Sequence, residues 1–352
     1  ANALLVDGNQ VIWAWPLAVI GLPALLSLFT AIAGALTVKL AQMRTIKGFA
    51  AFLFFFMGSE WLRGHLFTGF PWNLYGYSWI SNLPMAQTAS ITGIYGLSFL
   101  TLFWAALPGF LLRWNAAMHH KLICVFLALF TMATVFLYGH NRLSQYPTVL
   151  REDVIVRLIQ PDIIQQDKWN PEKATENFET LLRLSRPDEI NHTVSTLIVW
   201  PETAISQAYM ARNPTQTTQA LQELMGKYKA PAFLVSGISR YEIRPDNKPA
   251  YYNSIITLNS NLEKVNTYDK SHLVPFGEYI PLQKYIPLSP LVQYEGFTAG
   301  DGPETQNIPG IGQFSPLVCY EIIFPGAVTD PRNRPDFLVN VTNDAWYGDS
   351  AG

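Results

Sequence analysis

One stretch organises the second half of the chain: Leu317-Val318-Cys319-Tyr320-Glu321-Ile322-Ile323-Phe324-Pro325. The apolar run 314–318 predicts a short buried strand that ends at a cysteine, and a carboxylate follows two residues after the cysteine. Strand ends in α/β folds are where loops gather side chains around a substrate. A cysteine at such a position is either a small core residue or a nucleophile, and this stretch alone leaves both interpretations open.

Composition divides the chain into two parts. The protein has 352 residues, of which 49% are hydrophobic and 14% are charged, whereas about 25% charged residues is usual in a soluble protein. The shortfall is concentrated in residues 11–138, where long runs carry no charge. We therefore expect a transmembrane helical bundle in residues 1–150 and a globular domain in residues 151–352. Because the chain begins at Ala1 and stops at Gly352 within a polar loop, we also expect a fragment at both ends.

Charge and cysteine content argue against several classes of protein. The net charge is −2 and no basic stripe is present, which argues against nucleic acid as a partner. The two cysteines, Cys124 and Cys319, lie in different parts of the chain, so we expect no disulfide framework. No paired-cysteine or histidine-rich spacing predicts a zinc site. We expect neither a metal nor another cofactor.

The first part contains four apolar segments, since crossing a bilayer takes about 20 residues; they are residues 12–38, 48–62, 91–112 and 122–138. The second ends in Glu60 and Arg63, which should face protein or a membrane surface because a charge at mid-bilayer costs about 2.5–3.5 kcal/mol. Lysine and arginine occur in the first and third connections but not in residues 64–90. The positive-inside rule therefore places the globular part outside the cytoplasm, in the periplasm of a bacterium. Aromatic residues within 67–79 fit either an interfacial belt or a lipid-facing approach to a site.

The second part alternates short apolar runs with helical patterns. Strands are expected over residues 154–160, 196–200, 231–238, 252–258, 264–268, 314–318 and 336–341, and helices over residues 171–184 and 216–228. Strands that alternate with helices predict an α/β domain with a largely buried sheet.

Three strand ends each offer one ionisable residue: Glu202, Lys270 and Cys319. A cysteine nucleophile needs a base because its free pKa is about 8.5, and a buried glutamate could take the proton. Lys270 and the main-chain N–H of Tyr320 could stabilise a tetrahedral intermediate. The set is coherent for acyl transfer, but Glu202 could instead cap a following helix, and Lys270 could pair with its neighbouring aspartate at the surface. A Cys319–His272 pair is disfavoured, because His272 would point to the opposite face of a strand from Lys270.

The wording of these motifs adds a resemblance. They read Trp200-Pro201-Glu202-Thr203-Ala204, Lys270-Ser271-His272-Leu273-Val274-Pro275-Phe276-Gly277-Glu278-Tyr279 and Cys319-Tyr320-Glu321. They resemble the glutamate, lysine and cysteine motifs of the nitrilase (carbon–nitrogen hydrolase) superfamily, and in detail those of the bacterial apolipoprotein N-acyltransferase family. The first part adds Glu60-Trp61-Leu62-Arg63-Gly64 and Thr68-Gly69-Phe70-Pro71-Trp72. The resemblance therefore extends over essentially the whole chain.

The resemblance implies an αββα nitrilase-like domain carried on a transmembrane helical bundle. It also implies that Glu202 is the general base, Lys270 stabilises the tetrahedral intermediate, and Cys319 carries an acyl thioester. Supporting roles near the site would fall to Glu278, Tyr320, Glu321 and Trp169.

The activity implied by the resemblance is a two-step acyl transfer. The donor would be a phospholipid such as phosphatidylethanolamine, and the acceptor would be the α-amino group of a diacylglyceryl-modified cysteine at the N-terminus of an apolipoprotein. We expect a monomer in the bacterial inner membrane with its catalytic domain in the periplasm. Two alternatives stay open: a membrane-tethered amidase that uses the same three residues, and a non-enzymatic scaffold that binds lipids or lipoproteins.

Overall fold

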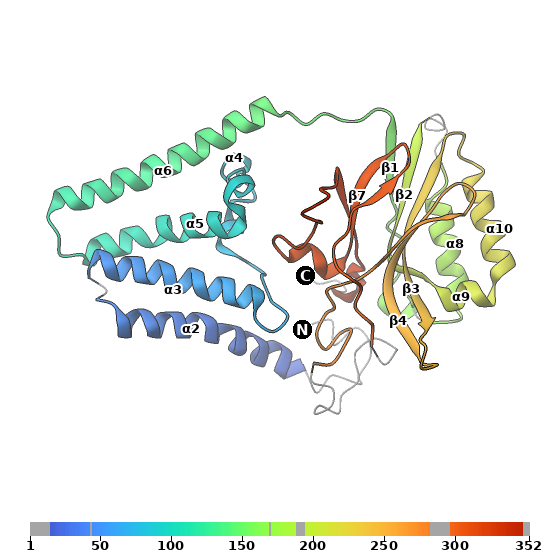
Figure 1. Cartoon of the computed structure of the whole chain (residues 1–352), viewed down its shortest axis with the longest axis horizontal. Coiled ribbons are helices and arrows are strands. Elements are labelled where there is room, and N and C mark those ends of the chain that lie inside the picture. Colours follow the sequence, from blue (N-terminus) through green and yellow to red (C-terminus); the bar gives the residue numbers. More distant parts are fainter. Residues whose placement is uncertain (1–14, 43, 169, 188–193, 282–295, 348–352) are drawn as a thin grey trace. The chain divides into compact units, whose positions relative to one another are not determined.

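The computed structural model describes residues 15–42, 44–168, 170–187, 194–281 and 296–347. Contacts divide the chain into two compact units, and each is described separately. One unit spans residues 16–150 and is helical (Figure 1). The other contains residues 151–352 and carries all the strands.

The helical unit is built from four long helices, drawn in blue to green in Figure 1: α2 (Leu22–Leu40), α3 (Ile46–His65), α5 (Ala89–Arg113) and α6 (Met118–Gln145). Within the described residues, three helical segments are long and apolar enough to cross a membrane: Leu17–Leu40, Ala89–Arg113 and Met118–Gln145. The remaining expected span coincides with α3, which is 20 residues long but carries Lys47, Glu60 and Arg63 and is not among these three.

The two charged residues near the end of α3, Glu60 and Arg63, face protein. Glu60 is 6% exposed, and its carboxylate accepts a hydrogen bond of 2.7 Å from Arg63, one helical turn later. The other terminal nitrogen of Arg63 donates to the main-chain oxygens of Phe70 and Trp72, at 2.7 and 2.8 Å. The ion pair therefore holds the connection that follows the helix, where an aromatic-rich segment begins.

The α/β unit has two sheets. Strands of the first are β1 (Val154–Leu158), β2 (Ser195–Ser206), β3 (Ala232–Ile243), β4 (Pro249–Leu258) and β5 (Lys264–Asp269), in that spatial order. Strands of the second are β6 (Gln306–Ile308), β7 (Gly312–Val318) and β8 (Phe337–Val341). Parallel pairs join β1 to β2, β2 to β3 and β7 to β8, and the other neighbours are antiparallel. The helices are α7 (Gln165–Lys168), α8 (Ala174–Leu184), α9 (Gln207–Arg212) and α10 (Pro214–Met225).

The layers follow from the alternation of side chains along the strands. On β2, Ile198 and Trp200 pack in one core cluster with residues of α8 and α10, on the side where Figure 1 shows these helices. Leu197 and Val199 point the other way and pack with residues of the second sheet. Strand β2 is thus buried on both faces. Main-chain hydrogen bonds then join the bulge of β2 to the residue after β8, and the residue after β5 to β4.

Strands β2 and β3 extend furthest beyond the sequence-based expectation. Strand β3 was expected to end at residue 238 but continues to Ile243. Strand β2 was expected to end at Trp200 but continues to Ser206 through a bulge, and the short helix α9 follows it directly. Strand β6 was not expected, because three residues are too few to show a period of two.

Candidate active site

Glu202 lies in a bulge of strand β2. Pairing with β3 is regular up to Trp200 and resumes at Ile205, so four residues of β2 face the single residue Gly237 of β3. A Cβ at position 237 would lie 2.4 Å from a main-chain oxygen of the bulge and 2.6 Å from the Cα of Glu202. The glycine therefore permits β3 to approach the bulge, and the bulge turns Glu202 out of the ladder.

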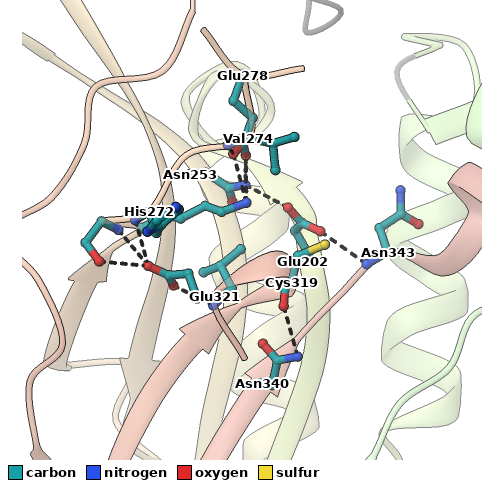
Figure 2. Close-up of polar contacts among 12 residues, drawn as sticks. Glu202, Asn253, His272, Val274, Glu278, Cys319, Glu321, Asn340 and Asn343 are labelled. Carbon is teal, nitrogen blue, oxygen red and sulfur yellow. Dashed lines mark hydrogen bonds and ion pairs between the residues drawn. The ribbon is translucent and has the colours of Figure 1, made fainter. Parts of the chain in front are cut away.

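Four contacts fix Glu202, which is 7% exposed. Its carboxylate accepts hydrogen bonds from Asn253 Nδ2 at 2.7 Å and from the main-chain N–H of Asn343 at 3.2 Å. Its own N–H donates to the carbonyl of Thr342 at 3.4 Å, and its carbonyl accepts from Lys168 Nζ at 2.9 Å. The carboxylate is thus held by Asn253 from within β4 and by Asn343 from the segment that follows β8, as Figure 2 shows.

Lys270 follows β5 and is only 1% exposed. Its ammonium group contacts both carboxylate oxygens of Glu278, at 3.0 and 2.9 Å. Burial opposes the charged form, but the charges of Glu278 and Glu202 outweigh it and raise the pKa of Lys270. The ammonium therefore stays charged at neutral pH. The alternative of a surface pair with Asp269 is wrong, because Asp269 is bonded to Arg240 instead.

Cys319 begins the 3₁₀ turn Cys319–Ile323 at the end of β7. Its φ of 52° lies in the left-handed region, where a non-glycine residue is held only by surrounding structure. Figure 2 shows its side chain beside the Glu202 carboxylate, and the charges of Glu202 and Lys270 both act on the thiol. Burial and then Glu202 raise the pKa of Cys319 to about 11, against the effect of Lys270. The thiol therefore keeps its proton at neutral pH and needs a base to become a nucleophile.

Glu321 connects the lysine segment to the cysteine segment. It is 3% exposed, and one carboxylate oxygen accepts from the N–H groups of Ser271 and His272 and from the hydroxyl of Tyr268, at 2.8, 3.0 and 2.8 Å. The other oxygen accepts from the N–H of Val318 at 2.9 Å. Glu321 therefore sets the spacing between the residues that follow Lys270 and the strand that ends at Cys319.

The structure thus brings Glu202, Lys270, Glu278 and Cys319 within electrostatic reach of one another. The alternative that Glu202 caps a helix is wrong, because Glu202 lies inside β2 and the next helix begins five residues later.

The Tyr320 ring packs edge-on against Phe324, with ring centroids 4.9 Å apart. Trp169 lies outside the described residues.

Sequence reasoning missed three residues that hold the glutamate: Lys168, Asn253 and Asn343. Asn253 was inside an expected strand, and an amide within an otherwise apolar run was the available signal. Asn343 was recognised only as part of the segment that follows β8, and Lys168 only as the neighbour of Trp169. Within the described residues, no three His, Cys, Asp or Glu side chains are grouped as a metal site would require.

A cavity of about 480 Å³ opens on the glutamate side of this cluster. Its polar lining includes Lys168, Glu202 and Asn343, and its apolar lining includes Phe178 and Trp200. The Glu202 carboxylate and the Lys168 ammonium group therefore border a space of the size that holds part of a small molecule.

Family models match most of the chain. Residues 155–352 match the carbon–nitrogen hydrolase model, and residues 1–107 match the model of the apolipoprotein N-acyltransferase N-terminal domain. The chain belongs to the carbon–nitrogen hydrolase family. Its second unit is accordingly a nitrilase-like α/β domain, preceded by helices that are apolar enough to span a membrane.

Curated relatives of this carbon–nitrogen hydrolase family member share one name. The apolipoprotein N-acyltransferase of Brucella melitensis biotype 1 is 38% identical over 367 residues, which cover 100% of this chain and 66% of the relative. That of Bradyrhizobium diazoefficiens is 35% identical over 98% of this chain and 65% of the relative. The chain therefore spans just under two thirds of the length of these relatives. An amidase of the nitrilase superfamily from Nesterenkonia AN1 aligns over 55% of this chain and 68% of its own, with 15% identity and a TM-score of 0.34.

Proposed function

We propose that this protein is an apolipoprotein N-acyltransferase that uses Glu202, Lys270 and Cys319 as its catalytic residues. The observation that carries the proposal is the convergence of a buried carboxylate in the bulge of β2, a buried ammonium group after β5 and a thiol after β7. Curated relatives of that name and the match of residues 1–107 to its N-terminal domain support the choice of acyl transfer over hydrolysis.

The first step forms the acyl-enzyme. Glu202 takes the thiol proton while the sulfur of Cys319 attacks the carbonyl carbon of a phospholipid ester. Electrons of the carbonyl bond move to its oxygen, and the Lys270 ammonium group stabilises that oxyanion. The C–O ester bond then breaks, and the leaving glycerol oxygen takes the proton back from Glu202. A thioester on Cys319 and a lysophospholipid result.

The second step transfers the acyl group. The α-amino group of a diacylglyceryl-modified N-terminal cysteine attacks the thioester carbonyl, and Glu202 accepts the proton that the amine loses. The C–S bond breaks, and the sulfur takes that proton from Glu202. An amide and the free Cys319 thiol are the products, so atoms and protons balance over the cycle.

Supporting residues act on these three. Glu278 orients the Lys270 ammonium group, to which it is bonded at 3.0 and 2.9 Å, and Asn253 links the two carboxylates by donating to both. Glu321 fixes the segment after Lys270 and the strand before Cys319, and Tyr320 contributes its main-chain N–H beside the developing oxyanion.

The lipid substrates fit a membrane location, since each buried CH₂ group contributes about 0.8 kcal/mol to membrane anchoring. We place the protein in the bacterial inner membrane as a monomer, with residues 151–352 in the periplasm. The distribution of lysine and arginine between the apolar segments supports that orientation. A reporter enzyme that works only outside the cytoplasm should be active when it is fused after Tyr146. A reporter that works only in the cytoplasm should be inactive at the same position, and the opposite result would reverse the orientation.

The test of the function uses the full-length protein and phosphatidylethanolamine in detergent micelles. Intact-mass measurement should show one acyl group added to the wild-type protein and none added to Cys319→Ala. Addition of a diacylglyceryl-modified peptide should then remove the acyl group from the wild-type protein. Glu202→Gln keeps the shape of the base and should slow acylation about 10²–10⁴-fold. Cys124→Ala, in the helical unit, is the matched control. Unchanged acylation in Cys319→Ala and Glu202→Gln would reject the proposal, and ammonia release from an amide without an acyl adduct would favour the tethered amidase.

A further inference from the structure

Strand β2 leaves one main-chain group of the general base without a ladder partner. The bulge interrupts pairing with β3 between Trp200 and Ile205, so the carbonyl of Glu202 falls outside the sheet ladder. A buried carbonyl that loses its partner destabilises the fold unless another donor replaces it. Lys168 supplies the partner, because its Nζ lies 2.9 Å from this oxygen.

The short helix that carries Lys168 is itself anchored to the site. In α7, Gln165 is 1% exposed, and its side-chain oxygen accepts from Asn343 Nδ2 at 2.8 Å. The main-chain N–H of Asn343 in turn donates to the Glu202 carboxylate. Asn177 of α8 donates to the carbonyl of Asp167 at 3.0 Å. Helix α7 therefore reaches Glu202 by two routes, one to the main chain and one to the carboxylate.

The charge of Lys168 acts on two groups besides the carbonyl. The Glu202 carboxylate and the Cys319 sulfur are both close enough to stabilise the charged form of Lys168, while burial opposes it and lowers the pKa of Lys168 to about 8. Asp162 and Asp344 line the same cavity as Lys168. The ammonium group of Lys270 is bonded to Glu278, and the pKa of Lys270 is raised instead of lowered. The two lysines therefore differ in when they lose their charge, although both face the nucleophile.

We propose that Lys168 is a positioning residue of the acyl-transfer site, which holds Glu202 by its main-chain carbonyl and presents a second positive charge to the Cys319 thiol. The role of Lys168 in catalysis rests on the proposed function. Its effect on the pKa of the Cys319 thiol does not, because a cation near a thiol favours the thiolate whatever the substrate.

The first test measures alkylation of Cys319 by iodoacetamide as a function of pH, in full-length protein that carries Cys124→Ala. Lys168→Met keeps the length of the side chain and removes the charge. It should slow alkylation at pH 7, where Lys168 is charged, by about three- to tenfold, since one pKa unit changes the thiolate fraction about tenfold, and the difference should shrink above pH 8. Lys168→Arg should restore the wild-type rate, because it keeps both the donor and the charge.

Lys173→Met is the matched control for loss of a lysine. Lys173 starts the next helix and pairs with Glu176 at the surface, with 43% of its side chain exposed. Its alkylation profile should superimpose on that of the wild type. A Lys168→Met profile that also superimposes on the wild type would overturn the proposal. If Lys168→Met does not fold, Lys168→Gln decides in the same way, because it keeps a donor for the carbonyl without the charge.

The second test separates this inference from the proposed function. In wild-type protein, acylation of Cys319 by phosphatidylethanolamine should lose rate as pH rises through about 8, and Lys168→Arg should keep its rate to higher pH. Wild-type protein that is never acylated, together with a shifted alkylation profile in Lys168→Met, would reject the function and retain the inference. Acylation profiles that are identical in wild type, Lys168→Arg and Lys168→Met would retain the function and reject the inference.

Discussion

Buried charge is arranged differently in the two units. In the helical unit, Glu60 and Arg63 come from one turn of one helix, and the pair holds the main chain of the next connection. In the α/β unit, Lys270 and Glu278 meet Glu202 and Cys319, which come from other strand ends. A local pair can be assembled as its helix forms, whereas the convergent set exists only once two sheets are packed. The comparison predicts that loss of the Glu60–Arg63 pair affects only stability, whereas loss of the Lys270–Glu278 pair also affects the reactivity of Cys319.

The largest effect on stability is expected for Glu278→Gln. Glu278 accepts from Lys270, Asn253 and the N–H of Val274, and a glutamine would turn its own NH₂ group toward at least one of these donors. It would also leave the Lys270 ammonium group buried without its main counter-charge. Loss of one partner of a buried ion pair costs about 3–5 kcal/mol, so the free energy of unfolding should fall by about that amount. Chemical denaturation of the full-length protein in detergent measures it.

The double variant Lys270→Met with Glu278→Gln controls for this interpretation. It removes the buried cation that the single variant leaves unpaired, so it should be less destabilised than the sum of the two single variants by about 0.5–3 kcal/mol. Strict additivity would show that the two side chains do not act as a pair, and it would remove the contrast with the helical unit.

A smaller effect is expected for Glu60→Gln in the helical unit. Arg63 would lose its counter-charge but keep the main-chain oxygens of Phe70 and Trp72, so its donors remain satisfied. We expect a loss of about 1–3 kcal/mol, measured by the same denaturation. The alkylation profile of Cys319 should not move, because the pair serves another unit. A shift of that profile by Glu60→Gln would contradict the division between structural and chemical pairs.

Much of the fold could be predicted because alternation of side chains is a local property. The run that became β3 carries apolar residues in both core clusters, and the run that became β7 carries them in the cluster between the two sheets, so both runs could be recognised as buried strands from the local sequence alone. The end of β2 could not be predicted in the same way. Pro201 lacks an N–H and suggested that the strand stopped before it, whereas the structure accommodates it in a bulge opposite Gly237.

In the candidate site, too, residues marked by the local sequence could be predicted, whereas residues that depend on distant contacts could not. Glu202, Lys270 and Cys319 could be singled out because each is a reactive residue just after an apolar run, and the family motifs added their roles. Asn253 could not, because the Glu202 carboxylate it binds lies 51 residues away in sequence. Lys168 was missed for a similar reason, since its acceptor exists only where the bulge frees a carbonyl.

The last expected effect appears only above neutral pH and concerns the pH dependence of stability. Burial and Glu202 raise the pKa of Cys319 to about 11 in the folded protein, against about 8.5 in the unfolded chain. The folded state therefore holds this proton more tightly, so the stability it contributes is fully present below about pH 8.5 and is lost as pH rises toward 11. Cys319→Ala lacks this contribution, and its free energy of unfolding should decline less than that of the wild type across this window. Cys124→Ala, in the helical unit, should decline in parallel with the wild type. Parallel curves for Cys319→Ala and wild type would mean that the thiol is not held neutral by its surroundings, and Cys319 would lose its dependence on Glu202 as a base.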